Sequence, residues 1–206
     1  MAANHSALAR GIGAVGLAVP RHVHGTRVVE ATASGDVGEA DAVITCEPDL
    51  GVLAMGADCL VIGIVCDDDR TVAAVHCGWR GLVGNVVGVT VDALAARGVR
   101  PRSVVLGPSI CGSCYPVPQE RAREVRERCP SDVAEAALVQ CADGQPGIDV
   151  RHGVRTQLAR LGVSDDQLVS IDLCTAEESG LFSHRRDGRT GRHGLVLVSH
   201  ELVSQS

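Results

Sequence analysis

The chain has 206 residues, of which 45% are hydrophobic, enough for a single domain over residues 1–206 with a sizeable core. Its net charge of −6 leaves no basic surplus for binding nucleic acid, and the absence of lysine among its 19 basic residues excludes lysine Schiff bases and P-loop chemistry. Nine scattered cysteines fit a reducing compartment in which they stay thiols and form no disulfides.

The first residues lack the basic start and apolar stretch of a secretion signal, and no apolar run approaches the ~20 residues that span a bilayer. We therefore expect a cytoplasmic protein without a membrane partner. Residues 6–19 are rich in Ala, Leu and Gly, which indicates the end of a helix that Pro20 breaks. Residues 26–30 and 41–45 are predicted to form short strands, and residues 49–51 a turn towards the centre of the chain.

A β-hairpin is predicted at the centre of the chain. The apolar runs 60–66 and 71–75 have strand length and β-branched content, and the acidic tripeptide between them is typical of a turn. Antiparallel pairing brings Cys59, before the first strand, and His76, after the second, to one end of the sheet although they are 17 positions apart. A thiol and an imidazole placed there can bind a metal or form a Cys/His dyad.

Beyond the hairpin, the order of elements indicates helices packed onto a sheet. Residues 77–81 are predicted to form a compact loop, Asn85 to cap a helix over 86–96, and residues 99–106 to form a strand. A unit of strand, helix and strand usually covers one face of a sheet, which favours the α+β class. Three more helices are predicted, over residues 119–129, after a cap at Ser131, and over residues 149–161. Strands are predicted over 168–173 and 195–199, and a cationic loop over 182–192.

His22 and His24 form a His-x-His pair shortly after Pro20. On a strand, both rings would point to one face, so that His24 can join Cys59 and His76 as a third ligand. Catalytic zinc sites combine two or three nitrogen and sulfur ligands with an open position, and two histidines with one cysteine fit that pattern. The spacings of 35 and 17 residues do not by themselves distinguish such a site from buried thiols and satisfied histidines.

Two further motifs carry weaker signals. Cys111 and Cys114 form a C-x-x-C pair, but a zinc ribbon needs a second pair of similar spacing and the chain has none, so we expect a structural role. The cationic loop carries four arginines that can bind an anion bidentately or form a solvated surface, namely Arg185, Arg186, Arg189 and Arg192. The three aromatic residues, which either shape pockets or fall in these stretches by chance, are Trp79, Tyr115 and Phe182.

Several motifs occur in one order along the chain. They are His-Val-His-Gly25, Ala-Asp-Cys59, Val-His-Cys-Gly-Trp-Arg-Gly81, Leu-Gly-Pro-Ser-Ile-Cys-Gly-Ser-Cys-Tyr115, Cys174-Thr175, and Phe182-Ser-His-Arg-Arg-Asp followed by Thr-Gly-Arg192. In this combination the chain resembles the laccase-domain family, also labelled multicopper polyphenol oxidases or peptidoglycan editing factors, and regarded as zinc-containing purine nucleoside phosphorylases. The resemblance implies a four-layer α-β-β-α sandwich and a zinc ion bound by His24, Cys59 and His76.

The family is credited with phosphorolysis of adenosine, inosine, guanosine and methylthioadenosine, and with adenosine deamination. The resemblance therefore implies a purine nucleoside and phosphate as substrates, with Cys59 and His76 as catalytic residues. Zinc could polarise a substrate oxygen while Arg80 and Arg186 neutralise charge on the substrates. A multicopper oxidase would also need many more imidazoles for a trinuclear cluster than the eight histidines here can supply, so we exclude a true laccase. We predict zinc as the metal, with copper as the alternative.

The chain departs from the family pattern, which usually begins a few dozen residues earlier with an Arg/Gly/Ser strand motif and an Asn-Leu-Gly segment. We therefore expect metal binding to be better preserved than activity. One alternative is a hydrolase or amidase of peptidoglycan precursors, in which His76 deprotonates Cys59 without a metal. Another is an inactive nucleoside-binding protein, and the oligomeric state stays open. Departures within the motifs occur at His22, Cys77, Pro116, Leu181 and His184.

Overall fold

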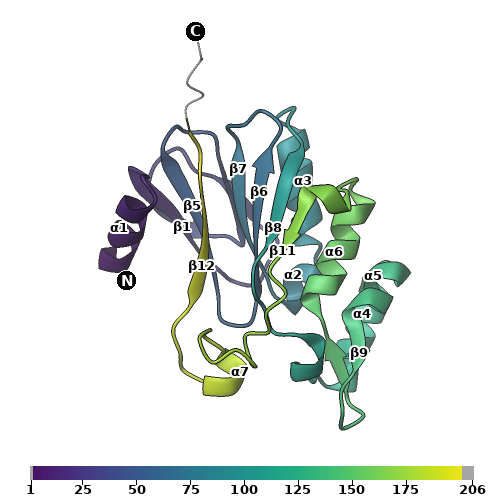
Figure 1. Cartoon of the computed structure of the whole chain (residues 1–206). Coiled ribbons are helices and arrows are strands. Elements are labelled where there is room, and N and C mark those ends of the chain that lie inside the picture. Colours follow the sequence, from purple (N-terminus) through teal and green to yellow (C-terminus); the bar gives the residue numbers. More distant parts are fainter. Residues whose placement is uncertain (1, 201–206) are drawn as a thin grey trace.

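The predicted hairpin lies at the centre of the fold. Strands β6 (Leu60–Cys66) and β7 (Val72–Cys77) pair antiparallel with Val61 opposite His76, and nearly all of their residues are buried. Such continuous apolar runs are typical of strands that are covered on both faces. The computed structural model describes residues 2–200 and surrounds the hairpin with further strands and helices (Figure 1).

A six-stranded mixed sheet contains the hairpin, in the order β11-β8-β6-β7-β4-β2. Because β6 pairs antiparallel with both β7 and β8, these two neighbours run parallel to each other. The chain between them includes a helix, so the predicted unit of strand, helix and strand is confirmed. The other strands of this sheet are β2 (Val28–Glu30), β4 (Ala42–Thr45), β8 (Pro101–Leu106) and β11 (Leu168–Ser170).

A four-stranded sheet, in the order β12-β5-β1-β3, stacks on the six-stranded one. Apolar side chains from both sheets, among them Val52, Val61 and Leu195, pack together in the layer between them. This arrangement explains why β6 and β7 show no alternation of polar and apolar residues. The strands of the second sheet are β1 (Gly16–Arg21), β3 (Gly35–Glu39), β5 (Leu50–Gly56) and β12 (His193–Val198).

The N-terminal part differs from the prediction of a helix over residues 6–19. Helix α1 (Ala2–Gly11) ends earlier, and β1 begins at Gly16. Pro20 lies inside β1 where the register with β3 shifts, a place where a missing N–H is tolerated. The predicted turn over residues 49–51 largely belongs to β5, whose small residues give it a weak strand pattern.

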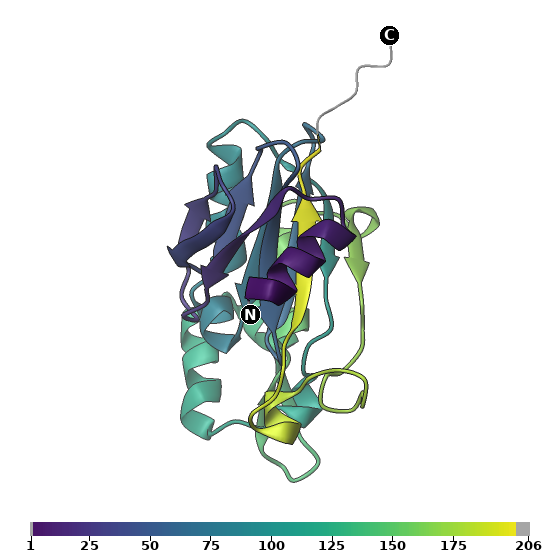
Figure 2. The same ribbon diagram turned by 90° about the vertical axis from the view of Figure 1, so that its left-hand side faces the viewer.

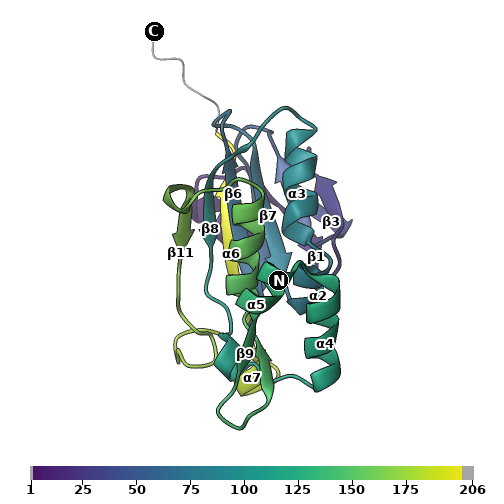
Figure 3. The same cartoon turned by 90° about the vertical axis from the view of Figure 1, so that its right-hand side faces the viewer.

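Helices cover the outer faces of both sheets and complete four layers. Helix α1 packs through Ala9 on Leu17 and Leu53 of the four-stranded sheet. Figure 2 shows this helix lying across the outer face of that sheet. Helices α2 to α6 share one core with the six-stranded sheet. They lie on the face of that sheet that is turned away from α1 (Figure 3). The fold therefore confirms the α+β class and the layered sandwich. The helix bounds are α2 (Trp79–Val83), α3 (Val86–Ala95), α4 (Gln119–Arg128), α5 (Ser131–Ala137) and α6 (Val150–Arg160).

Short polar residues begin two of these helices. Asn85 accepts a backbone N–H bond at the start of α3, as predicted, and Asp149 does the same for α6. Ser131 is the first residue of α5 and not its cap. The predicted loop over residues 77–81 is also wrong, because β7 ends at Cys77 and α2 begins at Trp79. No helix within residues 2–200 has the length and apolarity needed to cross a membrane. The shorter elements are η1 (Gly112–Cys114), β9 (Leu138–Gln140), β10 (Pro146–Ile148), η2 (Asp165–Gln167) and α7 (His184–Asp187).

Candidate metal centre

The structure brings together the three residues predicted as metal ligands. His24 lies between β1 and β2, Cys59 directly precedes β6, and His76 lies near the end of β7. Their ligand atoms all lie within 4.8 Å of one another, and Cys59 Sγ is 3.8 Å from His24 Nε2. Since β6 and β7 pair in the register that sets Leu60 opposite Cys77, the hairpin itself places Cys59 beside His76.

Asp41, which the sequence analysis did not identify, orients this cluster. Its carboxylate is fully buried and accepts hydrogen bonds from His76 Nδ1 at 2.8 Å and from the backbone N–H groups of His24 at 3.0 Å and Gly25 at 2.6 Å. The bond to Nδ1 leaves Nε2 of His76 as the ring nitrogen that can bind a metal. The carboxylate of Asp41 also holds the backbone of His24, which adopts a left-handed conformation with φ of 60°.

His22 belongs to the supporting structure and not to the donor set. Its Nδ1 donates to the Ala40 carbonyl at 3.2 Å and its Nε2 accepts from the Met55 N–H at 3.1 Å, so both nitrogens are engaged. The ring stacks on His76 at 4.5 Å between centroids. Burial and the neighbouring His76 lower the pKa of His22 to about 4, so it is neutral at physiological pH. The His-x-His pair converges through a turn after β1, and not through strand alternation as predicted.

The cluster favours a charged form of Cys59. Burial opposes ionisation of this thiol, but its hydrogen bonds with His24 and His76 outweigh that effect and lower its pKa to about 6. Burial likewise disfavours protonated His76, but Asp41 and Cys59 together raise its pKa to about 9. A thiolate is the form of cysteine that binds metals and acts as a nucleophile, so Cys59 is suited both to metal binding and to nucleophilic catalysis.

The donor set fits a zinc ion. With Zn–S of about 2.3 Å and Zn–N of about 2.0 Å, a tetrahedral site separates sulfur from nitrogen by about 3.5 Å, close to the observed 3.8 Å between Cys59 and His24. Gly78 keeps the space beside these atoms free, because a Cβ there would lie 3.1 Å from both Cys59 Sγ and His24 Cδ2. His24 is exposed and Cys59 half-buried, so a further ligand can approach from solvent.

Arginine and aromatic side chains lie next to the cluster. Arg80, predicted to bind substrate, stacks on Trp79 at 4.6 Å, and Arg121 of α4 stacks on the same ring at 4.8 Å. Arg185 lies 4.9 Å from the centre of the Tyr115 ring. Burial raises the pKa of Tyr115, with Arg121 lowering it and Cys59 raising it, which links this ring electrostatically to the cluster. Arg121 escaped the sequence analysis because α4 has the pattern of an ordinary charged surface helix.

Arg186, the second arginine predicted to bind substrate, holds its own loop together. It pairs with Asp187 and donates to several carbonyl groups, among them Thr175 at 3.0 Å and Leu181 at 2.6 Å. These bonds occupy most of its guanidinium donors, and its role towards a substrate stays a prediction. Asp58 ties the same loop to Cys59, since it accepts from Thr175 Oγ1 at 2.7 Å and Arg185 N at 2.7 Å.

The fold and the cluster together define a class of protein. Its members are α+β sandwiches in which two histidines and one cysteine meet at the end of a central hairpin. The chain belongs to the family described as multi-copper polyphenol oxidoreductase laccase, whose model matches residues 1–200. The resemblance drawn from the sequence motifs is thereby confirmed.

The chain is also similar to individual proteins within this family. A Streptomyces coelicolor protein named purine nucleoside phosphorylase is 40% identical over 175 residues, which cover 82% of this chain and 69% of that protein. A Mycobacterium bovis protein that is also named purine nucleoside phosphorylase is 36% identical over 206 residues, which cover 96% of this chain and 78% of that protein. The crystal structure of YlmD from Geobacillus stearothermophilus superimposes with a TM-score of 0.86 at 27% identity, covering 96% of this chain and 79% of that one.

Proposed function

We propose that this protein is a zinc-dependent purine nucleoside phosphorylase. The observation that carries the proposal is the convergence of His24, Cys59 and His76, with Asp41 fixing the orientation of His76. The names of the relatives supply the substrate class, a purine nucleoside together with phosphate. Adenosine, inosine, guanosine and methylthioadenosine are the substrates we expect, with adenosine deamination as a second activity.

In phosphorolysis, a phosphate oxygen bonds to C1′ of the ribose while the bond from C1′ to the purine nitrogen breaks. The base leaves with the electron pair and takes up a proton, and the sugar carries positive charge in the transition state, as in glycoside cleavage. When bound, zinc supplies positive charge that polarises a phosphate or substrate oxygen. The protein contributes binding and orientation of the two substrates around C1′.

Three arginines are suited to the phosphate. Arg80 and Arg121 both stack on the Trp79 ring, and Arg185 stacks on the Tyr115 ring. Guanidinium groups bind phosphate oxygens bidentately, and aromatic stacking limits their freedom before the substrate arrives. The exposed ring of Phe182 is available to stack on a purine. We assign Asp41 the task of keeping the proton on Nδ1 of His76, so that Nε2 stays available to bind the metal.

The test is phosphate-dependent release of purine from inosine by the wild type and Cys59→Ala. Cys46→Ala is the matched control, because Cys46 is another half-buried free thiol outside the cluster. Cys59→Ala should lower turnover by about 100-fold or more, since the metal supplies several kcal/mol and ~1.4 kcal/mol is a factor of ten. Equal turnover in the wild type and Cys59→Ala, or release that does not require phosphate, would refute the proposal.

A cysteine hydrolase or amidase is the second candidate, and one geometric feature favours it. Asp41, His76 and Cys59 form a series in which a carboxylate holds the histidine that adjoins a thiolate, as in Cys/His enzymes. Iodoacetamide distinguishes the two candidates. A thiolate engaged with zinc is alkylated mainly after chelation, whereas a free catalytic thiolate reacts equally fast with and without the chelator.

A further inference from the structure

A second cluster of metal-binding side chains lies apart from the first and shares no residue with it. The thiols of Cys111, Cys114 and Cys174 and the carboxylate of Glu177 bring one ligand atom each to within 4.8 Å of all the others. Cys114 Sγ lies 3.3 Å from Glu177 Oε1, close to the separation of about 3.5 Å that a tetrahedral zinc site gives sulfur and oxygen ligands.

The four side chains come from two turns of the same design. Cys111 and Cys114 are three residues apart, and the N–H of Cys114 donates to the carbonyl of Cys111 at 3.2 Å. Cys174 and Glu177 are also three residues apart, and the N–H of Glu177 donates to the carbonyl of Cys174 at 3.1 Å. Two such turns that face each other are the arrangement of a zinc ribbon, with glutamate in place of the fourth cysteine.

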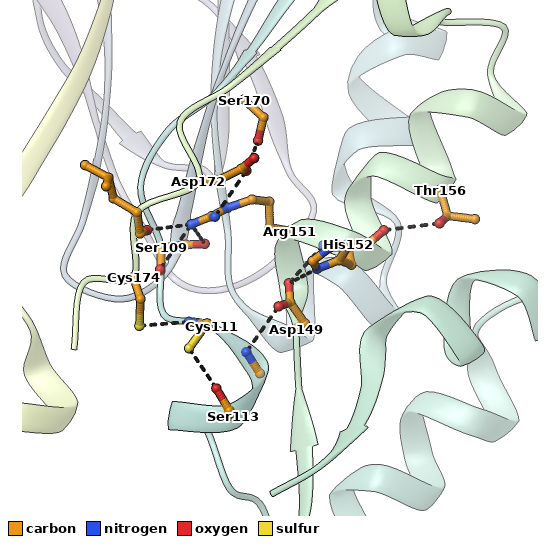
Figure 4. Close-up of polar contacts among 12 residues, drawn as sticks. Ser109, Cys111, Ser113, Asp149, Arg151, His152, Thr156, Ser170, Asp172 and Cys174 are labelled. Atoms are coloured by element: carbon orange, nitrogen blue, oxygen red, sulfur yellow. Dashed lines mark hydrogen bonds and ion pairs between the residues drawn. The ribbon is translucent and has the colours of Figure 1, made fainter. Parts of the chain in front are cut away.

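Backbone contacts hold the two turns side by side. Ser109 and Cys174 form a parallel β-bridge, and the N–H of Cys111 donates to Cys174 Sγ at 3.3 Å (Figure 4). Arg151 of α6 is almost fully buried and donates to the carbonyls of Ser109 at 3.2 Å and Leu173 at 2.7 Å, which fastens both segments to the helix (Figure 4). The ligand positions are therefore set by the fold and not by one flexible loop.

Two arginines hold the segment around Cys174 in place. Arg151 donates to the carbonyl of Leu173, directly before Cys174, and Arg186 donates to the carbonyl of Thr175, directly after it, at 3.0 Å. Arg151 also pairs with Asp172 and Arg186 with Asp187, so these arginines position Cys174 and their charges are balanced by those carboxylates. Cys174 is buried while Glu177 is exposed, so the cluster has a rigid inner ligand and an outer ligand that a metal can reach from solvent.

We propose that Cys111, Cys114, Cys174 and Glu177 form a second metal site, specific for a thiophilic divalent cation such as Zn²⁺. Three sulfur ligands favour zinc over harder cations such as Mg²⁺ and Ca²⁺. All four tetrahedral positions are filled by the protein, which is typical of a structural and not a catalytic ion. The sequence contains no second C-x-x-C pair, and in this proposal Cys174 and Glu177 take the place of that pair. The proposal does not depend on the nucleoside activity.

The experiment uses the full chain with Cys59→Ala, which removes the only thiolate of the first cluster. Reduced, chelator-treated protein is titrated with Zn²⁺ and with Co²⁺, whose sulfur-to-cobalt charge-transfer absorption reports thiolate ligands. We expect one equivalent of Co²⁺ with the strong charge-transfer absorption of several thiolates, displaced by Zn²⁺. Adding Cys114→Ala should remove this binding. Binding without a thiolate absorption band, or no binding at all, would overturn the proposal.

Glu177→Gln in the same background keeps the test independent of folding, because Glu177 is exposed. Removing a group that only hydrogen-bonds to a metal ligand lowers the metal affinity by roughly 10–100-fold. Removing the ligand itself should therefore lower the affinity by at least about 10-fold. Glu178→Gln is the matched control, since Glu178 is the exposed neighbouring acid outside the cluster, and it should leave the affinity unchanged. Unchanged Zn²⁺ affinity in both Cys114→Ala and Glu177→Gln, with circular dichroism showing folded protein, would also overturn it.

Discussion

Asp41 controls the first cluster although it offers it no ligand atom. Its carboxylate is fully buried, an arrangement that is stable only because hydrogen-bond donors surround the charge. Burial raises the pKa of Asp41, but the hydrogen bonds from His76 and from the N–H groups of Gly25 and His24 outweigh it, so the net shift is downwards. One side chain thus fixes both the tautomer of His76 and the turn that carries His24.

Asp41→Asn should therefore weaken zinc binding without removing a ligand. The amide keeps the size of the side chain but loses the charge that holds the proton on His76 Nδ1, and loss of such a partner costs roughly 10–100-fold in affinity. Competition with a chromophoric chelator measures the change. Asp36→Asn is the control, because Asp36 is exposed and pairs with Arg21 instead. Equal zinc affinity in Asp41→Asn and the wild type would contradict this role.

The residues of the first cluster differed in how visible they were in the sequence. Cys59 and His76 could be predicted because Cys59 directly precedes one strand of a recognisable hairpin and His76 lies near the end of the other, and pairing alone brings them together. Asp41 could not, because an acidic residue before a short strand has no distinguishing pattern. Glu177 was missed for a related reason, since exposed glutamates are common and two of its three partners, Cys111 and Cys114, lie more than fifty positions away.

At the level of elements, the turn between β6 and β7 is the feature that fixes the hairpin register. Asp68 accepts hydrogen bonds from Thr71 Oγ1 at 2.7 Å, from Thr71 N at 2.8 Å and from Arg70 N at 3.2 Å. Burial raises the pKa of Asp68, but these bonds outweigh it, and the net shift is below the ordinary value. The ionised carboxylate therefore stabilises the turn on which the positions of Cys59 and His76 depend.

Asp68→Ala should lower the free energy of unfolding by about 1 kcal/mol at pH 7, as loss of a comparable capping side chain does. Because the pKa is lower in the folded state, this contribution is present above the unfolded pKa of about 4 and is lost as the pH falls through the folded value. Urea unfolding of both proteins across this range measures it, and the difference should shrink in acid. Glu135→Ala, an exposed change of equal charge in α5, should show no such trend; a constant difference for Asp68→Ala would contradict the assignment.

Element prediction succeeded where the local signal and the tertiary environment agree. The hairpin has apolar runs around an acidic turn, and α3 has its Asn85 cap, so both were predicted near their observed bounds. The sequence did not predict β1 and β5, because their content of Gly, Ala and Pro disfavours strands. Only pairing within the four-stranded sheet makes these segments extended. Their β-structure is imposed by tertiary contacts, which local patterns do not report.

Over the whole molecule, both clusters join segments that are distant along the chain. The first unites residues 24, 59 and 76, and the second joins 111–114 to 174–177. Neither ligand set exists in the unfolded chain, where the same residues are far apart and mobile. A metal that binds these clusters therefore binds the native state selectively, and its binding free energy adds to the free energy of unfolding.

Zinc should accordingly stabilise the folded chain in two separable steps. At a free concentration of about 100 times Kd, each site adds about 2.7 kcal/mol to the free energy of unfolding. Thermal unfolding with and without zinc measures the increment in the wild type, Cys59→Ala and Cys59→Ala/Cys114→Ala. Cys59→Ala should lose the part that belongs to His24, Cys59 and His76 and keep the part that belongs to the cysteine-rich cluster, while the double variant should lose both. If zinc raised the unfolding temperature of all three proteins equally, its effect would come from nonspecific binding and neither cluster would be a metal site.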